Sequence, residues 1–170
     1  MAHPSDQGNE IEKSANLSKG PGVYIPPPFF YVVTFLAAVF AQKKCPIAPA
    51  LSGHLAFKVG GALLSIAAAF FLSKSLRQFF KTKNTVVLIR PASSLQTTGV
   101  YGISRNPMYV GLAFLYFAIA CFIGSAWNLI LLPALFLVIQ EYVIKREERY
   151  LGREFGPQYE DYKKKVRRWL

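Results

Sequence analysis

The residues best suited to chemistry lie in two short segments of this chain of 170 residues. The first segment, residues 99–111, contains Arg105 and Tyr109, and the second, residues 147–162, opens with two adjacent glutamates. An arginine, a tyrosine and two carboxylates can hold a charged or zwitterionic ligand through charge-assisted hydrogen bonds. The two segments together are therefore the candidate binding site.

The first segment predicts the start of a helix. Pro107 keeps Asn106 out of a helical conformation and is itself favoured at a first helical position. Arg105 and Tyr109 would then flank a helix N-terminus, whose free N–H groups and partial positive charge suit a carboxylate or a phosphate. The alternative is a plain junction between a loop and a membrane helix, where Gly, Pro, Arg and Tyr are all common.

The second segment predicts two helices separated at Gly156-Pro157, with Tyr159 and Tyr162 on one face of the second helix. The alternative is an amphipathic tail whose glutamates only neutralise nearby basic residues such as Lys145 and Arg146. The basic residues that follow are expected to stay in water or to meet anionic headgroups: Lys163, Lys164, Lys165, Arg167 and Arg168.

An apolar stretch separates the two segments and is long enough to cross a membrane twice. Its two arms, residues 109–124 and 126–144, carry no charge before Glu141 and are each about 25 Å long as helices. A hairpin of helices would return both segments to one membrane face. With two earlier apolar stretches, the chain is predicted to be an all-α integral membrane protein of about four transmembrane helices with a cytoplasmic C-terminal helical cap. The predicted spans are residues 23–41, 51–72, 109–124 and 126–144.

The charge pattern predicts the orientation. The net charge is +11, and the basic residues gather in regions 73–108 and 145–170. The positive-inside rule places both regions, and with them both termini, in the cytoplasm. Residues 1–22 are polar and resemble no cleavable signal peptide, so we expect a flexible tail followed by a single membrane domain over residues 23–170.

Several site types find no support in the sequence. The chain has 2 Cys and 2 His, which are isolated from one another, so no metal site and no His-based catalytic triad is expected. No glycine-rich turn predicts a soluble dinucleotide-binding fold. The positive charge lies at membrane borders without a nucleic-acid-binding module, so no nucleic-acid partner is expected. The sequence gives no indication of the oligomeric state.

In these motifs the chain resembles the isoprenylcysteine carboxyl methyltransferase family and its relatives among the membrane phospholipid methyltransferases. The resemblance covers residues 74–169. It rests on Gly-x-Tyr, then Arg-x-Pro-x-Tyr-x-Gly, then Glu-Glu-x-x-Leu-x-x-x-Phe-Gly-x-x-Tyr-x-x-Tyr, in this order across the hairpin.

The resemblance implies a membrane enzyme that binds S-adenosylmethionine beside the last two spans and methylates a lipidic or prenylated acceptor entering from the bilayer. Arg105, Glu147 and Glu148 are the implied catalytic residues. The implied cofactor-binding residues are Ser93, Ser94, Leu95, Gln96, Tyr101, Arg105, Asn106, Pro107, Tyr109, Glu147 and Glu148.

Two departures from the family pattern concern the acceptor. Asn106 stands where the eukaryotic prenylcysteine enzymes usually carry His, and Val143 stands where they place an Arg linked to the substrate. The compact motifs look more like the bacterial branch, which implies the inner membrane. We expect a carboxylate acceptor; the alternatives are phospholipid N-methylation, a nicotinamide-dependent membrane reductase, and a noncatalytic lipid-binding protein.

Overall fold

The computed structural model describes residues 20–47, 54–81 and 94–170, and within these ranges every regular element is helical. Three helices come first: α2 (Pro27–Lys44), α3 (Leu55–Lys81) and α4 (Pro107–Ile123), with the short 3₁₀ turn η2 (Gly99–Gly102) before α4. A long helical run follows. Its parts are α5 (Ala126–Ile130), α6 (Leu132–Val138), the π-helical turn η3 (Ile139–Ile144) and α7 (Lys145–Phe155), after which α8 (Pro157–Lys165) folds back.

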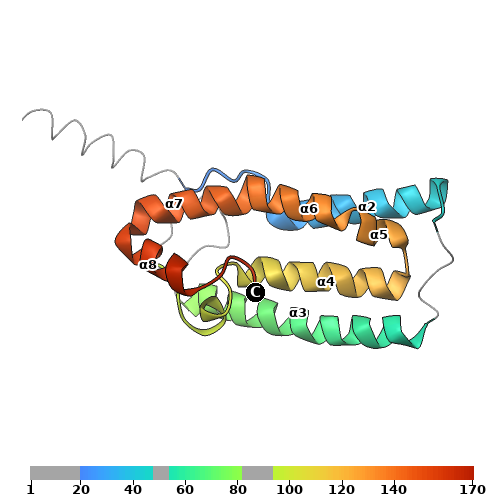
Figure 1. Cartoon of the computed structure of the whole chain (residues 1–170), viewed down its shortest axis with the longest axis horizontal. Coiled ribbons are helices and arrows are strands. Elements are labelled where there is room, and N and C mark those ends of the chain that lie inside the picture. Colours follow the sequence, from blue (N-terminus) through green and yellow to red (C-terminus); the bar gives the residue numbers. More distant parts are fainter. Residues whose placement is uncertain (1–19, 48–53, 82–93) are drawn as a thin grey trace, which may run out of the picture.

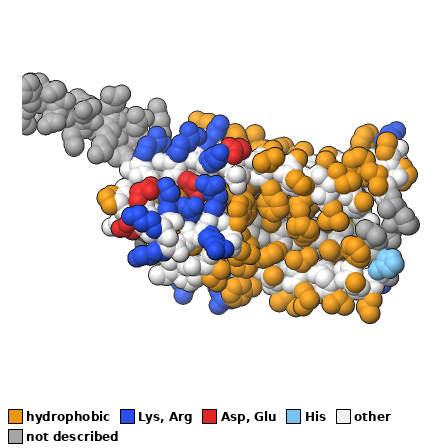
Figure 2. All heavy atoms as spheres, viewed as in Figure 1, with side chains coloured by type: hydrophobic (Ala, Val, Ile, Leu, Met, Phe, Trp, Pro, Cys, Tyr) orange, Lys and Arg blue, Asp and Glu red, His pale blue; other side chains and the backbone are white. Residues whose placement is uncertain are grey.

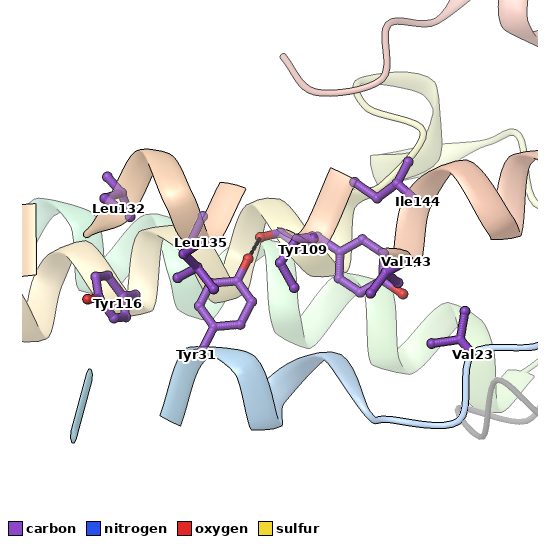
Figure 3. Packing of buried hydrophobic residues seen from close by; sticks show 10 residues of the cluster. Val23, Tyr31, Tyr109, Tyr116, Leu132, Leu135, Val143 and Ile144 are labelled. Carbon is purple, nitrogen blue, oxygen red and sulfur yellow. Dashed lines mark hydrogen bonds between the residues drawn. The ribbon is translucent and has the colours of Figure 1, made fainter. Parts of the chain in front are cut away.

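The helices lie lengthwise beside one another (Figure 1). α3 and α4 pack together in opposite directions, and α2 packs against α4, α5 and α6. Between α2, α4 and α6 lies a core of buried side chains that includes Tyr31, Tyr109 and Leu135 (Figure 3). This core ties the start of α4 to the end of the long helical run.

The hairpin predicted for the second half of the chain is confirmed. α4 ends at Ile123, and Gly124 adopts the left-handed conformation (φ 68°) that only glycine adopts without strain, which lets the chain reverse. The returning helix extends past the predicted end at residue 144 and continues to Phe155. The predicted break at Gly156-Pro157 is also confirmed.

Two helices of the described residues are long and apolar enough to cross a membrane, Leu55–Gln78 and Ala126–Phe155. α4 is apolar but has 17 residues, and α2, which begins at Pro27 instead of residue 23, is not among the candidates. Two of the four predicted spans therefore meet the criteria of length and composition. Residues 1–19 of the polar tail predicted over residues 1–22 lie outside the described residues. The single domain over residues 23–170 stays a prediction.

The surface divides into an apolar body and a charged end (Figure 2). Large apolar side chains along the body face outward, among them Leu36, Leu63 and Leu137, each more than half exposed. Such a surface belongs in lipid instead of water. The charged side chains gather over α7 and α8, where the polar half of the long helical run emerges from the apolar body.

Candidate functional site

α4 begins directly after a short, tightly held loop. Pro107 is the first helical residue, a position whose N–H has no partner within the helix, so the missing N–H of proline costs no hydrogen bond. The main-chain N–H of Asn106 donates to the Ser104 hydroxyl (3.1 Å), and both residues are buried. The loop thus fixes Arg105, which lies between them, at the N-terminal end of α4. The helix start predicted at Pro107 is confirmed.

Two arginines share the carboxylate of Glu148. Arg168 binds it through two nitrogens, with Nε donating to Oε1 (2.9 Å) and Nη2 to Oε2 (2.6 Å). Arg105 Nη2 lies 3.1 Å from Oε1 of the same carboxylate. The side chains of Arg105 and Glu148 are 10% and 13% exposed, so water screens their attraction little. The two motif segments meet at one end of the helices, as the hairpin predicts.

Arg105 has donors that this network does not use. Its Nε and Nη1 are buried and have no hydrogen-bond partner among the described residues. Leaving a buried donor unpaired costs about 1–3 kcal/mol, and more when the group is charged. Native structures seldom tolerate this without a reason such as a ligand. The free donors of Arg105 are therefore suited to bind an anionic group.

The second glutamate faces α4 instead of the arginines. The hydroxyl of Tyr109 donates to Glu147 Oε1 (2.7 Å), and the hydroxyl of Tyr31 donates to the main-chain oxygen of Tyr109 (3.3 Å) (Figure 3). Glu147 and Glu148 are adjacent in sequence and yet have different partners. A tyrosine hydroxyl thus holds Glu147, whereas two arginines hold Glu148.

The π-helical turn η3 ends at Ile144, three residues before Glu147. Such turns are rare and are found frequently at functional sites. Val143 lies in η3 and is fully buried in the core between α2, α4 and α6. The position that carries a substrate-linked Arg in the eukaryotic enzymes is therefore a packing position in this chain.

Buried tyrosines from two elements, η2 and α8, lie near the arginine network. The hydroxyl of Tyr162 donates to the main-chain oxygen of Tyr101 (2.6 Å), which ties α8 to η2. Burial raises the pKa of the Tyr162 hydroxyl to about 12, with a smaller opposing effect of Arg105, and burial likewise raises the pKa of Tyr101. Tyr159, the neighbour of Tyr162, is also buried, so the face predicted for these two residues is confirmed. All three hydroxyls stay protonated at neutral pH.

The segment before η2 is tied to α3. Gln96 accepts a hydrogen bond from the amide of Gln78 (3.0 Å) and donates to the Ser94 hydroxyl (2.9 Å), while Leu95 between them is half-buried. Ser93 lies outside the described residues. Cofactor binding by these four residues stays a prediction.

Two sequence interpretations of the basic residues are wrong. Arg168 is not simply solvated or directed at headgroups, because Glu148 binds its guanidinium, although 31% of the side chain stays exposed. The glutamates also do not neutralise Lys145 and Arg146: Lys145 binds Glu141 (2.7 Å), and Arg146 donates to the main-chain oxygen of Gly22 (3.0 Å).

Sequence reasoning also missed the partners of the loop before α4. Arg168 lies twenty residues after Glu148 in a run of basic residues, so no spacing singles it out. The hydroxyl of Ser104 donates to the main-chain oxygen of Arg168 (3.2 Å), and the amide of Asn106 donates to the same oxygen (2.9 Å). Asn106 therefore holds the backbone of Arg168, and its expected contact with the ligand stays a prediction.

A family model described as phospholipid methyltransferase matches residues 56–158, which is more than half of the chain. The chain belongs to the phospholipid methyltransferase family. This is the isoprenylcysteine carboxyl methyltransferase-like family, so the resemblance carried by the motifs is confirmed. The matched range includes Arg105 and both glutamates, whereas Arg168 lies beyond it.

One curated relative is an uncharacterized protein of Haemophilus influenzae, 40% identical over 63 residues. The match covers 37% of this chain and the whole of that relative. No solved structure matches the chain. Membership in the family makes this protein a membrane methyltransferase in class, and such enzymes generally use S-adenosylmethionine.

Proposed function

We propose that this protein transfers a methyl group from S-adenosylmethionine to a carboxylate on a lipidic molecule, such as a prenylcysteine, at the cytoplasmic face of a bacterial inner membrane. The observation that carries the proposal is the buried guanidinium of Arg105, which has two unused donor nitrogens at the N-terminal end of α4. A carboxylate of the cofactor would meet both the donors and the positive end of the helix.

The chemistry of the donor set fits S-adenosylmethionine. Arg105 would hold the methionine carboxylate, and Glu147 is the nearby acceptor that a ligand ammonium or ribose hydroxyl could share with Tyr109. The aromatic ring of Tyr101 can lie against the adenine or a cation. When bound, S-adenosylmethionine supplies a methyl group already activated as a sulfonium.

The residues of the site favour an acceptor that needs no base. A C-terminal carboxylate has a pKa of about 3.5 and is ionised at neutral pH. Both oxygens of Glu148 already accept hydrogen bonds from arginines, and Glu147 accepts one from Tyr109. The protein's contribution would then be to orient the acceptor and to exclude water. An aminolipid acceptor would have to lose a proton, and Glu147 would be the base.

The position of the site supports a lipidic acceptor. The two glutamates lie in the first turn of α7, directly after the apolar part of the long helical run, and Arg105 contacts Glu148. The border between the charged end and the apolar body is the level at which a lipid carries its polar group (Figure 2). A molecule with its chain in the bilayer could reach this level sideways, without leaving the membrane. The acceptor class remains part of the proposal.

The experiment uses the full chain reconstituted in lipid with methyl-labelled S-adenosylmethionine and a bacterial membrane extract. Mild base is then added to the labelled product. We expect volatile methanol, because base hydrolyses a methyl ester. Protein with Arg105→Gln serves as the matched control and should produce far less label at the same cofactor concentration.

Other outcomes identify the alternatives. A product whose label resists base would contradict the carboxylate acceptor and support phospholipid N-methylation. No transfer, together with binding of a reduced nicotinamide cofactor, would support the reductase. No binding of either cofactor would leave a noncatalytic lipid-binding protein.

A further inference from the structure

The residues that follow α8 form a strap over the loop before α4. The strap, residues 166–170, begins at Val166 in an extended conformation (φ −123°, ψ 134°). Figure 1 shows this end of the chain beside the start of α4. The main-chain N–H of Arg105 donates to the main-chain oxygen of Arg167 (2.9 Å), and two further bonds from Ser104 and Asn106 reach the oxygen of Arg168.

An aromatic contact fixes the far end of the strap. The ring of Trp169 packs edge-on against Phe136 of α6 with centroids 5.3 Å apart, and its N–H reaches Gln140 at 3.5 Å. The backbone position of Arg168 therefore depends on contacts that do not involve its own side chain. A change of that side chain alone should leave the strap in place.

The Arg168 side chain limits the hydrogen bonds that the Glu148 carboxylate can accept from Arg105. Arg168 occupies both oxygens of the carboxylate, in the two-pronged geometry that is strongest for such pairs. Arg105 keeps one lateral contact to Glu148, and its Nε and Nη1 stay free. Without Arg168, Glu148 could turn both oxygens to Arg105 and take up those donors.

We propose that Arg168 is a positioning residue that occupies Glu148 and so keeps the Arg105 donors available for the anionic group of the ligand. This inference rests on the proposed function, in which that group is the carboxylate of S-adenosylmethionine. Glu148 has the complementary role: it orients Arg105 through one contact, and with Arg168 removed it becomes a competitor of the ligand.

The test compares two probes on the full chain in lipid nanodiscs. One probe is S-adenosylmethionine, and the other is its decarboxylated analogue, which lacks the anionic group. In Arg168→Gln we expect the affinity for S-adenosylmethionine to fall about tenfold, the effect of losing one charge-assisted contact. The affinity for the decarboxylated analogue should stay within about twofold of wild type.

Two further variants separate competition from damage to the fold. Arg153→Gln removes the same charge from an exposed position of α7 and should bind both probes as wild type does. Glu148→Gln combined with Arg168→Gln removes the competing carboxylate and should recover most of the affinity that Arg168→Gln loses. A purely structural role of Arg168 would instead make the double variant as weak as the single one, or weaker.

Failure of this inference differs from failure of the proposed function. If wild type binds neither probe, the proposed function is wrong and the inference falls with it. If wild type binds S-adenosylmethionine and Arg168→Gln binds it equally well, only the positioning role is overturned. Equal loss of both probes in Arg168→Gln would also overturn it, because a general loss does not depend on the ligand carboxylate.

Discussion

The two ends of α4 both bury polar side chains, but of different kinds. At the first end, Arg105 and Glu148 form a charged network with donors left over. At the other end, the hydroxyl of Tyr116 donates to Asn128 Oδ1 (3.1 Å) and to its main-chain oxygen (3.3 Å). Asn128 is fully buried directly after the hairpin turn.

Unpaired atoms occur at both ends, so their presence alone does not identify a binding site. Asn128 Nδ2 and Ser125 Oγ are also buried without a partner among the described residues. They are neutral groups that belong to one turn and its helix, whereas the Arg105 donors are charged and lie where three distant segments converge. An unpaired donor that belongs to a charged group costs more to bury than an unpaired neutral donor. The comparison therefore favours the first end as the proposed binding site and a structural role for the second.

The largest expected effect is that of Arg105→Gln. It removes the charged donors from the first end, so the affinity for S-adenosylmethionine should fall about 100-fold, the effect of losing two charge-assisted contacts. Equilibrium binding in nanodiscs measures this. The matched variant at the other end, Asn128→Ala, should lower the melting temperature in detergent and keep the affinity within about twofold. An unchanged affinity in Arg105→Gln would show that the free donors do not hold the ligand.

The next effect concerns the second glutamate of the charged end. Tyr109→Phe removes the donor that lies 2.7 Å from Glu147 and should lower the free energy of unfolding by about 1.5–3 kcal/mol, because a carboxylate loses a charge-assisted bond. Unfolding in mixed detergent micelles measures this. Tyr31→Phe removes a longer bond, 3.3 Å to a main-chain oxygen, and is the control with the smaller loss. Equal losses would mean that the charge of Glu147 adds nothing to the bond.

A third effect tests the packing that holds the charged end together. A Cβ added at Gly111 would lie 2.8 Å from Leu72 Cγ and 3.1 Å from the Leu72 main-chain nitrogen on α3. Gly111→Ala should therefore destabilise the protein by about 1–3 kcal/mol through overpacking. Gly60→Ala is the matched control, because nothing lies within 4 Å of a Cβ there.

A second variant shows whether the contact itself is the cause. Leu72→Ala opens space beside Gly111 and should make Gly111→Ala less damaging than it is in wild type. If Gly111→Ala and Gly60→Ala lower the melting temperature equally, the motif does not need Gly111 for the close approach of α3 and α4.

The sequence predicted the parts of this arrangement that depend on local rules. Pro107 predicts where α4 begins, and Gly156-Pro157 predicts the break between α7 and α8. The uncharged run after residue 126 predicts a helix long and apolar enough to cross a membrane. The roles of Arg168 and Tyr31 could not be predicted in this way. Their partners lie 20 and 78 residues away, and such contacts depend on how the helices pack. Asn106 shows the same limit. Its motif position predicts a ligand contact, but only the fold reveals that its amide also donates to the strap.

The smallest expected effect is at the neutral end of α4. Tyr116→Phe removes the hydroxyl that donates to Asn128 and should lower the free energy of unfolding by about 0.5–1.5 kcal/mol, the usual contribution of a neutral hydrogen bond. The affinity for S-adenosylmethionine should stay at the wild-type value. Removing both partners together leaves fewer unpaired groups, so Tyr116→Phe with Asn128→Leu should lose less stability than the sum of the two single changes. A fall in affinity in Tyr116→Phe would show that the two ends of α4 are coupled, and the neutral cluster could then not be purely structural.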